Sequence, residues 1–471
     1  MRVRFAPSPT GNLHIGSVRT ALFNWFFASH HNATLVLRIE DTDKQRSSND
    51  FEQNIIDGLE WLGIPFDESP DNPGPYGPYR QSERIAANCY ESHLNQLQNS
   101  GHIYRCFCTA EELDAERERA KTNKKPYVYS RTCLRLSDDE IAKKIAQSAP
   151  FTYRFKVPHE SLVFHDLIRG PVEFDLSLLS DFILTKPNGQ PNYNFAVVAD
   201  DIDMKITHVL RGEDHISNTP KQLLLFKALT KTVPEFGHLP IILGEDRSKL
   251  SKRHGATAVI DYQKQGFLPA ALINYLALLG WSPNSEVERL SANDICKQFT
   301  LNRVNKSGAI FDMAKLTWMN GQYIRDLSTD DLMSHIEPFL NPAARQLLTE
   351  SPHNSAIIEL VHDSLDTLAD INECLSIFLL NTIDIPKQSW SPEQRIILTQ
   401  FRDHLKASNS SEPNNLKSLL MTIKTDLSLT VGMVFKTVRL AISGQPSGPD
   451  LMTYLSIHYD VLIERLTHQL A

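Results

Sequence analysis

Two short segments, far apart in the chain, carry the residue types best suited to chemistry. The first is residues 6–17 (APSPTGNLHIGS), where a turn rich in proline and glycine leads to His14 at the expected start of a helix. Free N–H groups and the positive end of the helix dipole favour phosphate at such a start. The second is residues 249–253 (KLSKR), which place Lys252 on an expected loop. Each segment also has a purely structural explanation, the first as an ordinary helix start and the second as a solvated turn. The rest of the chain must therefore show whether the two segments have a role in catalysis.

The elements around the first segment are expected to alternate between strand and helix. Residues 1–6 and 34–39 are apolar runs that predict strands, and residues 15–31 predict a helix. One apolar face of this helix is formed by Val18, Ala21, Leu22, Trp25 and Phe26. Asn49 with Glu52 predicts a capping box for the next helix. This order is typical of a doubly wound α/β sheet.

The pattern changes in the middle of the chain. Residues 84–189 are interpreted as an insertion that holds a charged helix over residues 111–125 and strand-like segments at 151–157 and 172–174. The sheet is expected to resume with a strand at 193–199 and another at 206–210.

The last third of the chain is expected to be helical. From residue 267 onward helical periodicity dominates, and few strand signals follow Arg325. Ser391 and Gln394 predict a capping box, with a proline at the first helical position between them. The apolar face of that helix is formed by Ile397, Phe401 and Leu405.

Composition excludes several classes of protein. The chain has 471 residues, 41% of them hydrophobic and 22% charged, which is ordinary for a globular protein. No uninterrupted apolar run reaches about eighteen residues, so no membrane span is expected. Residues 2–5 run straight into the first turn, so no signal peptide is expected. Six cysteines in so long a chain do not form a secreted disulfide framework, and we expect a cytoplasmic protein. The net charge of −8 requires any nucleic-acid surface to be local.

The two segments and several others resemble the glutamyl-tRNA synthetase family of class I aminoacyl-tRNA synthetases, in which they correspond to the HIGH and KMSKS motifs. The other segments are residues 4–11 (RFAPSPTG), 37–43 (LRIEDTD), 77–82 (GPYRQS), 192–195 (NYNF), 209–215 (VLRGEDH), 311–320 (FDMAKLTWMN) and 438–444 (VRLAISG). The resemblance therefore covers nearly the whole chain. Ser17 and Arg253 depart from the motifs, and neither departure affects His14 or Lys252.

The resemblance implies four parts. They are a Rossmann-like catalytic domain (1–83 and 190–245), an inserted α+β acceptor-stem domain (84–189), a helical stem-contact region (246–325) and an all-α anticodon-binding region (326–471).

It also implies that the two segments activate an amino acid with ATP. The carboxylate attacks the α-phosphate, and donors placed on the charge of the transition state supply most of the catalysis. His14 and Lys252 suit that role, and Lys249 is a further catalytic cation. Gly16 leaves room for adenine or ribose, and Asp214 is implied in ATP binding. Mg²⁺ is expected through the phosphates of ATP.

The amino acid implied by the resemblance is L-glutamate. Its pocket is expected to consist of Arg4, Ser8, Glu40, Tyr193 and Arg211. The two guanidinium groups can grip carboxylates, and Glu40 can pair with the ammonium. Glutamine would leave a desolvated arginine partly unpaired and is rejected without editing. The sequence leaves open which arginine binds which carboxylate of glutamate. It also leaves open whether Arg4 instead forms a simple ion pair across the sheet. Val197 replaces an asparagine of some family members.

Three cysteines in the insertion suggest zinc. Cys106, Cys108 and Cys133 are one ligand short of the four that a structural zinc takes. Family members with this zinc knuckle supply a His or Tyr near the third cysteine. Arg135 lies two residues beyond Cys133 and cannot ligate, so Tyr129 is the best substitute. The alternative is three reduced thiols without a metal.

The expected macromolecular partner is tRNA(Glu), bound by a monomer. The cations near the knuckle are Arg117, Arg119, Lys121, Lys124 and Lys125. Their positions fit two interpretations equally well, namely binding of acceptor-stem phosphates and a helix face exposed to solvent. One rival function is that of a glutamyl-queuosine tRNA(Asp) synthetase, which lacks the helical last third. Another is a non-catalytic tRNA-binding paralogue, which intact His14, Lys249 and Lys252 argue against. Charging of tRNA(Gln) stays open.

Overall fold

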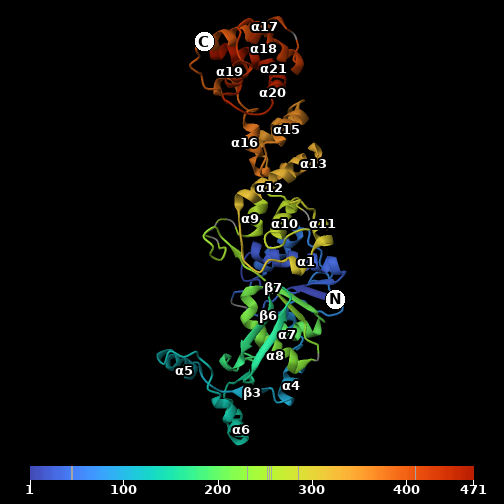
Figure 1. The fold of residues 1–471 in the computed structure, drawn as a ribbon, viewed down its shortest axis with the longest axis vertical. Coiled ribbons are helices and arrows are strands. Elements are labelled where there is room, and N and C mark those ends of the chain that lie inside the picture. The colour runs from blue at the N-terminus through green and yellow to red at the C-terminus, as the bar shows by residue number, and fades with distance from the viewer. Residues whose placement is uncertain are drawn as a thin grey trace. The chain divides into compact units, whose positions relative to one another are not determined.

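The computed structural model describes residues 1–43, 46–230, 232–251, 253, 255, 257–284, 286–408 and 410–471 (Figure 1). They form two units, one of residues 1–261 with 273–312 and the other of residues 262–272 with 313–471. None of the described helices is both long and apolar enough to cross a membrane.

A parallel sheet forms the centre of the first unit. Strand β1 (Arg2–Phe5) pairs in parallel with β2 (Thr34–Leu37), and β7 (His208–Gly212) pairs in parallel with β8 (Glu235–Leu239). The backbone N–H of Thr207 donates to Arg2 O at 2.9 Å and joins the two pairs. These parallel pairs, with helices between their strands along the chain, confirm the predicted α/β fold. In such sheets ligands bind at the carboxyl ends of the strands, here beside Phe5 and Gly212.

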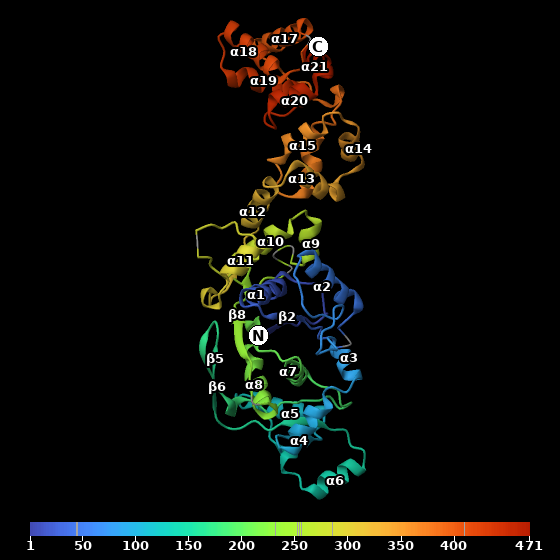
Figure 2. The same cartoon turned by 90° about the vertical axis from the view of Figure 1, so that its right-hand side faces the viewer.

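Helix α1 (Ile15–His31) follows β1 with the predicted bounds. Val18, Ala21, Leu22 and Phe26 of the predicted apolar face are buried, and Trp25 is half-buried. Asn32 ends the helix in the left-handed region, at φ 49°. Figure 2 shows α1 close to β2 and β8, at the upper end of the sheet.

The strand predicted at 193–199 is wrong, because these residues begin helix α7 (Tyr193–Asp203). Every residue from Phe195 to Ala199 is buried. A short apolar run that is buried on all sides has no periodicity to distinguish helix from strand. The helix places Tyr193 in its first turn and carries Asp200 and Asp201, which bear on the site below.

The predicted capping box of helix α2 (Asn49–Trp61) is also wrong. Ser48 caps the helix, since its hydroxyl accepts from Phe51 N at 3.2 Å, and Asn49 is the first helical residue. Glu52 instead accepts a hydrogen bond from Arg80 Nε at 2.7 Å.

The insertion contains the predicted strands and helix. Its elements and those just before it are α3 (Gln81–Ala86), α4 (Glu91–Asn99), β3 (Ile103–Cys106), α5 (Ala110–Thr122), α6 (Asp138–Ala146), β4 (Thr152–Phe155), β5 (Ser161–Asp166) and β6 (Gly170–Asp175). Strands β3 and β4 pair antiparallel, as do β5 and β6, and β5 also joins β8 in parallel. The rest of the unit contains α8 (Thr219–Leu229), β9 (Ile242–Leu243), α11 (Ala292–Gln298) and β10 (Ala309–Ile310). Helices α9 (Val259–Lys264) and α10 (Pro269–Leu278) each span a boundary between the units.

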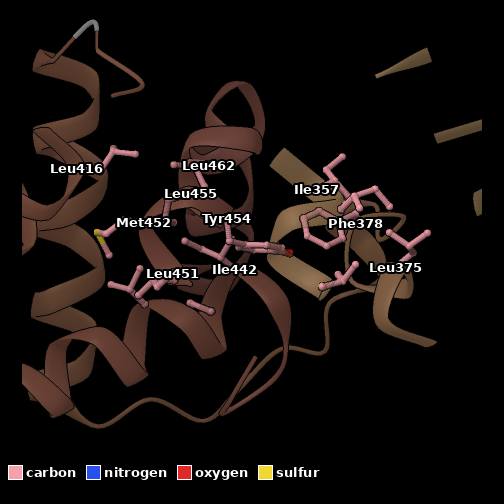
Figure 3. Close-up of a cluster of buried hydrophobic side chains, with 14 of the residues drawn as sticks. Ile357, Leu375, Phe378, Leu416, Ile442, Leu451, Met452, Tyr454, Leu455 and Leu462 are labelled. Atoms are coloured by element: carbon pink, nitrogen blue, oxygen red, sulfur yellow. The ribbon is translucent and has the colours of Figure 1, made fainter. Parts of the chain in front are cut away.

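The second unit is helical, as predicted, and its described residues after Asp312 contain no strand. Its helices are α12 (Met313–Arg325), α13 (Thr329–Ile336), α14 (Pro342–Glu350), α15 (Asn354–His362), α16 (Ile371–Ser376), α17 (Pro392–Ala407), α18 (Pro413–Asp426), α19 (Val431–Ser443), α20 (Leu451–Ile457) and α21 (Tyr459–Leu470). Its apolar core includes Tyr454, whose ring lies beside Phe378 with centroids 5.4 Å apart (Figure 3).

Helix α17 begins with the predicted capping box. Ser391 Oγ accepts from Gln394 N at 3.2 Å, and Gln394 Oε1 accepts from Ser391 N at 2.9 Å. We expect Ser391→Ala to lower the free energy of unfolding by about 1 kcal/mol, because the backbone N–H of Gln394 in the first turn loses its acceptor. Urea unfolding checks this against Ser418→Ala, whose hydroxyl only donates back to Asn414 O at 2.9 Å. Equal stability of the two variants would contradict the assigned cap.

Candidate active site

A cavity of about 430 Å³ lies at the carboxyl ends of β1 and β7. Every described residue that the sequence predicted for ATP, glutamate or catalysis lines it. These residues are Arg4, Ser8, His14, Gly16, Glu40, Tyr193, Arg211, Asp214 and Lys249. Lys252, the remaining predicted residue, lies outside the described residues. The structure therefore brings together side chains from five separate segments of the chain.

His14 marks the start of α1 and is positioned by its own helix. Its Nδ1 accepts a hydrogen bond from Gly16 N at 3.0 Å, so the proton of the neutral ring is on Nε2. Burial and the charge of Lys249 lower the pKa of His14 and favour this neutral form. A Cβ at Gly16 would lie 3.3 Å from His14 Nδ1, so glycine keeps the ring in place. The arrangement leaves Nε2–H as the donor of a neutral imidazole.

The chain that follows residues 249–253 holds the turn before α1. Ile15 N donates to Thr257 O at 2.9 Å, and Val259 N donates to Leu13 O at 2.9 Å. The first segment singled out in the sequence is thus joined, close to His14, to the chain that follows the second. Lys249 Nζ lies 3.5 Å from Asp214 Oδ2, with side chains 66% and 54% exposed. A pair this exposed contributes little stability and separates easily when a ligand arrives.

Two of the residues that line the cavity, Arg4 and Glu40, take part in buried ion pairs. Arg4 Nε lies 3.2 Å from Asp201 Oδ1, and Arg38 lies 2.7 Å from the same oxygen and 3.0 Å from Glu40 Oε1. Burial opposes the ionisation of Asp201, but the charges of Arg4 and Arg38 outweigh it and lower the pKa of that carboxyl. Burial raises the pKa of Glu40 despite the opposing charge of Arg38. Arg4 therefore forms an ion pair, which was the alternative interpretation of this residue, and its partner is Asp201 of helix α7.

Arg211 differs from these arginines because its partners are neutral. It is 6% exposed, and in the part of the chain that the structure describes no carboxylate forms an ion pair with it. Its guanidinium donates to Gln222 Oε1 at 2.7 Å, to Thr219 Oγ1 at 2.9 Å and to His238 Nε2 at 3.2 Å. Burial lowers its pKa to about 10. A buried cation without a counter-charge is a favourable place for the carboxylate of a ligand.

Tyr193 lies close to Arg211 and is joined to a histidine that the sequence reasoning missed. Its hydroxyl lies 3.0 Å from His215 Nδ1. Burial raises the pKa of Tyr193 to about 12, and burial together with Arg211 lowers the pKa of His215 to about 4. Both groups are therefore neutral near pH 7 and act as hydrogen-bonding groups of the cavity wall.

Three other functional residues were missed. Arg38 and Glu40 have the spacing of residues on one face of a strand, a signal that could have revealed their pair. Asp201 was hidden by the wrong prediction of a strand over α7. Arg19 lines the cavity and bonds the carbonyls of Pro240 and Leu279, partners far away in sequence that no local pattern reveals.

The three cysteines of the insertion meet a tyrosine, as predicted. The sulfur atoms of Cys106, Cys108 and Cys133 lie within 4.8 Å of one another. The hydroxyl of Tyr129 lies 3.5 Å from Cys106 Sγ and 3.3 Å from Cys108 Sγ. Arg135 bonds the carbonyl of Ser130 at 3.1 Å. Hydrogen bonds from Cys133 and Tyr129 lower the pKa of Cys106 to about 4, so one thiolate is favoured in the cluster.

Comparison with known proteins agrees with the fold. Residues 1–318 match the family described as tRNA synthetases class I (E and Q), catalytic domain, and residues 331–469 match the family described as anticodon binding domain. A glutamate–tRNA ligase of Sulfurihydrogenibium sp. (strain YO3AOP1) is 44% identical over 100% of this chain and 98% of its own length. One from Aquifex aeolicus (strain VF5) is 44% identical over 95% of this chain and 94% of its own length.

A solved structure gives the same result. The crystal structure of a glutamate tRNA ligase from Elizabethkingia meningosepticum CCUG26117, in complex with its amino acid, superposes with a TM-score of 0.91 at 32% identity. The superposition covers 100% of this chain and 99% of that chain. With a catalytic domain and an anticodon domain that together span nearly all its length, the chain belongs to the class I tRNA synthetases of the E and Q type, as a member of the glutamate–tRNA ligases.

Proposed function

We propose that this enzyme activates L-glutamate with ATP and transfers it to the 3′-terminal adenosine of tRNA(Glu). An oxygen of the α-carboxylate attacks the α-phosphorus of ATP, the bond to pyrophosphate breaks, and glutamyl-adenylate forms. A ribose hydroxyl of the tRNA then attacks the acyl carbon and AMP leaves. The observation that carries the proposal is a cavity lined both by the start of helix α1 at His14 and by the buried Arg211, which forms no ion pair with any carboxylate among the described residues.

His14 and the two lysines of residues 249–253 act on the phosphates. Nε2–H of His14 donates to the α-phosphate oxygens as their negative charge grows, and Lys249 and Lys252 neutralise the departing pyrophosphate. Gly16 and Asp214 line the part of the cavity that receives the nucleoside. Mg²⁺ enters with ATP, held mainly by phosphate oxygens, and supplies further charge neutralisation.

Arg211 binds the side-chain carboxylate of glutamate. The α-carboxylate is the nucleophile, and a strong buried ion pair would hold it back from phosphorus. The side-chain carboxylate does not react, so it suits the buried cation that has no counter-charge. Glu40 pairs with the ammonium group, while Arg4, Ser8 and Tyr193 complete the polar wall. An amide in place of the side-chain carboxylate leaves the charge of Arg211 uncompensated, which disfavours glutamine.

Exchange of pyrophosphate into ATP tests the activation step. We expect exchange with glutamate in the presence of tRNA(Glu), and little with glutamine. Absence of exchange under all conditions would overturn the proposal. Aminoacylation of purified tRNA(Glu) and tRNA(Gln) then determines the tRNA choice. The helical residues 331–469 favour the ligase over the glutamyl-queuosine tRNA(Asp) alternative, which lacks such a region.

Cys106, Cys108, Cys133 and Tyr129 form the proposed zinc site. Three sulfur atoms and a phenol oxygen converge, which is the ligand number of a structural zinc, and of the cysteines only Cys108 is partly exposed. Arg154 lies 4.1 Å from the ring centroid of Tyr129. Burial and the hydrogen bonds with Cys106 and Cys108 raise the pKa of Tyr129, so its phenol would lose the proton only to a bound metal. The metal would join β3 to the segment 129–135.

Removing one sulfur tests this site. Wild-type protein is expected to contain one zinc per chain, and Cys133→Ser is expected to lose it and to melt at a lower temperature. Metal analysis and thermal unfolding provide the readout. Cys89→Ser is the control, because Cys89 lies outside the cluster and is expected to keep the zinc. A metal-free wild type that is indifferent to chelators would favour three reduced thiols.

The proposed partner is tRNA(Glu), bound by a cytoplasmic monomer. Helix α5 and the residues after it carry the cations proposed for acceptor-stem phosphates. Arg117 pairs with Asp114 at 2.5 Å, and Lys121 pairs with Glu118 at 3.5 Å. These exposed pairs are weak enough for phosphate to replace the carboxylates. The helical unit is proposed to contact the anticodon.

A further inference from the structure

Arg211 is the end of a buried hydrogen-bonded chain that crosses three neighbouring strands. His238 of β8 lies opposite Arg211 of β7 in the parallel register, and Asp166 ends β5 on the other side of β8. Asp166 Oδ2 lies 2.5 Å from His238 Nδ1, and His238 Nε2 lies 3.2 Å from Arg211 Nε. Asp166 and His238 are both fully buried, and neither lines the cavity.

The donors and acceptors of this chain determine where its proton lies. The Nε–H of an arginine can only donate, so His238 Nε2 must be the unprotonated acceptor. The proton of the neutral ring is therefore on Nδ1, where the carboxylate of Asp166 accepts it. Thr219 Oγ1 also lies 3.0 Å from His238 Nε2, and its hydroxyl can donate there or to His215 O. The contact with Arg211 thus requires this tautomer, and the contact with Thr219 is compatible with it.

The two oxygens of Asp166 have different partners. Oδ1 accepts from the backbone N–H groups of Ile168 and Arg169 at 2.9 Å each, and so shapes the turn between β5 and β6, and it also accepts from the backbone N–H of His238 at 3.3 Å. Oδ2 is the atom that contacts the ring of His238. The contact to the ring can therefore be changed while the turn keeps its acceptor.

We propose that Asp166 and His238 are positioning residues that hold the guanidinium of Arg211 for the side-chain carboxylate of glutamate without neutralising it. The imidazole supplies a neutral acceptor to Nε, as Gln222 and Thr219 do to the other nitrogens. The carboxylate of Asp166 fixes the tautomer from the far side of the ring, where its charge is kept away from Arg211. A carboxylate in direct contact with Arg211 would compete with the substrate. This inference rests on the proposed function of Arg211.

Two substitutions at position 238 separate positioning from structure. His238→Leu removes the acceptor and is expected to raise the KM for glutamate roughly 10- to 100-fold, the loss of one hydrogen bond to a charged group. kcat and the KM for ATP are expected to change little, because the interaction is present before and during the reaction. His238→Gln keeps an acceptor oxygen and is expected to recover most of the affinity. Equal KM values for glutamate in His238→Leu and wild type, at equal melting temperature, would overturn the proposal.

Asp166→Asn tests which nitrogen of His238 carries the proton. It also provides the test of the proposal if His238→Leu does not fold. The amide keeps an acceptor for the turn but can donate to Nδ1, which moves the ring proton to Nε2 and opposes Arg211. The KM for glutamate is expected to rise and the preference for glutamate over glutamine to fall. The ¹⁵N spectrum of histidine-labelled wild type, with His238 assigned by its loss in His238→Gln, is expected to show the neutral Nδ1–H tautomer. An imidazolium or an Nε2–H tautomer would overturn the proposal. This spectrum requires no activity, so its result is distinguishable from a failure of the proposed function.

Discussion

Replacing Arg211 with alanine is expected to lower kcat/KM for glutamate by about 2–5 kcal/mol, roughly 30-fold to several thousand-fold. The physical reason is that the side-chain carboxylate of the substrate would enter a buried place that no longer contains its counter-charge. Pyrophosphate exchange at varied glutamate concentration measures the loss. The KM for ATP is expected to stay near its wild-type value, because Arg211 contacts no part of the helix start at His14.

Arg211→Lys is the matched variant for this prediction. It keeps the positive charge but loses the planar fork that donates to Gln222, Thr219 and His238 at once. We expect an intermediate kcat/KM for glutamate and a reduced preference for glutamate over glutamine. An alanine variant within fivefold of wild type at unchanged melting temperature would contradict the assignment of Arg211 to the side-chain carboxylate.

Replacing His14 with alanine is expected to slow adenylate formation by a factor on the order of 10²–10³, because one donor to the charged transition state is lost. The same change removes the N-cap of α1, since Gly16 N loses the acceptor that lies 3.0 Å away. A cap is worth about 1 kcal/mol, so His14→Ala is also expected to be less stable.

His14→Asn separates these two effects. Asparagine is a good N-cap and its oxygen can accept from Gly16 N, but its amide does not reach as far as the imidazole Nε2–H. We expect the stability of wild type together with the slow exchange of the alanine variant. Exchange at the wild-type rate in His14→Asn would show that His14 matters for the helix and not for the chemistry.

The pH dependence of the free energy of unfolding provides a further test of His14. Its pKa is lowered in the folded protein, so the unfolded chain binds the proton more readily. The stability due to His14 is therefore complete above the unfolded pKa of about 6.5 and is lost as the pH falls toward the lowered value. In His14→Asn this acid-side loss is expected to be smaller than in wild type, as measured by urea unfolding between about pH 5 and pH 7.

The sequence alone determined those features that depend on neighbours in the chain. The bounds of α1, the capping box at Ser391 and the helical nature of the last third were predicted correctly, because periodicity and capping act over a few residues. The resemblance of short segments selected candidate residues from distant parts of the chain, and those that the structure describes line one cavity. The sequence also pointed to Tyr129 as a fourth zinc ligand, and its hydroxyl lies beside the sulfur atoms of Cys106 and Cys108.

Tertiary structure decided what the candidate residues can do. The prediction of a strand over α7 failed because a completely buried run has no polar face, and with it Asp201 was missed. Only the fold shows that Asp201 neutralises Arg4, a residue 197 positions away, while Arg211 is left with neutral partners. The charge available to a ligand depends on such distant pairs, and local sequence does not encode them. The residue types were therefore readable from the sequence, but the difference between the two arginines arises from the topology that brings β1, β7 and α7 together.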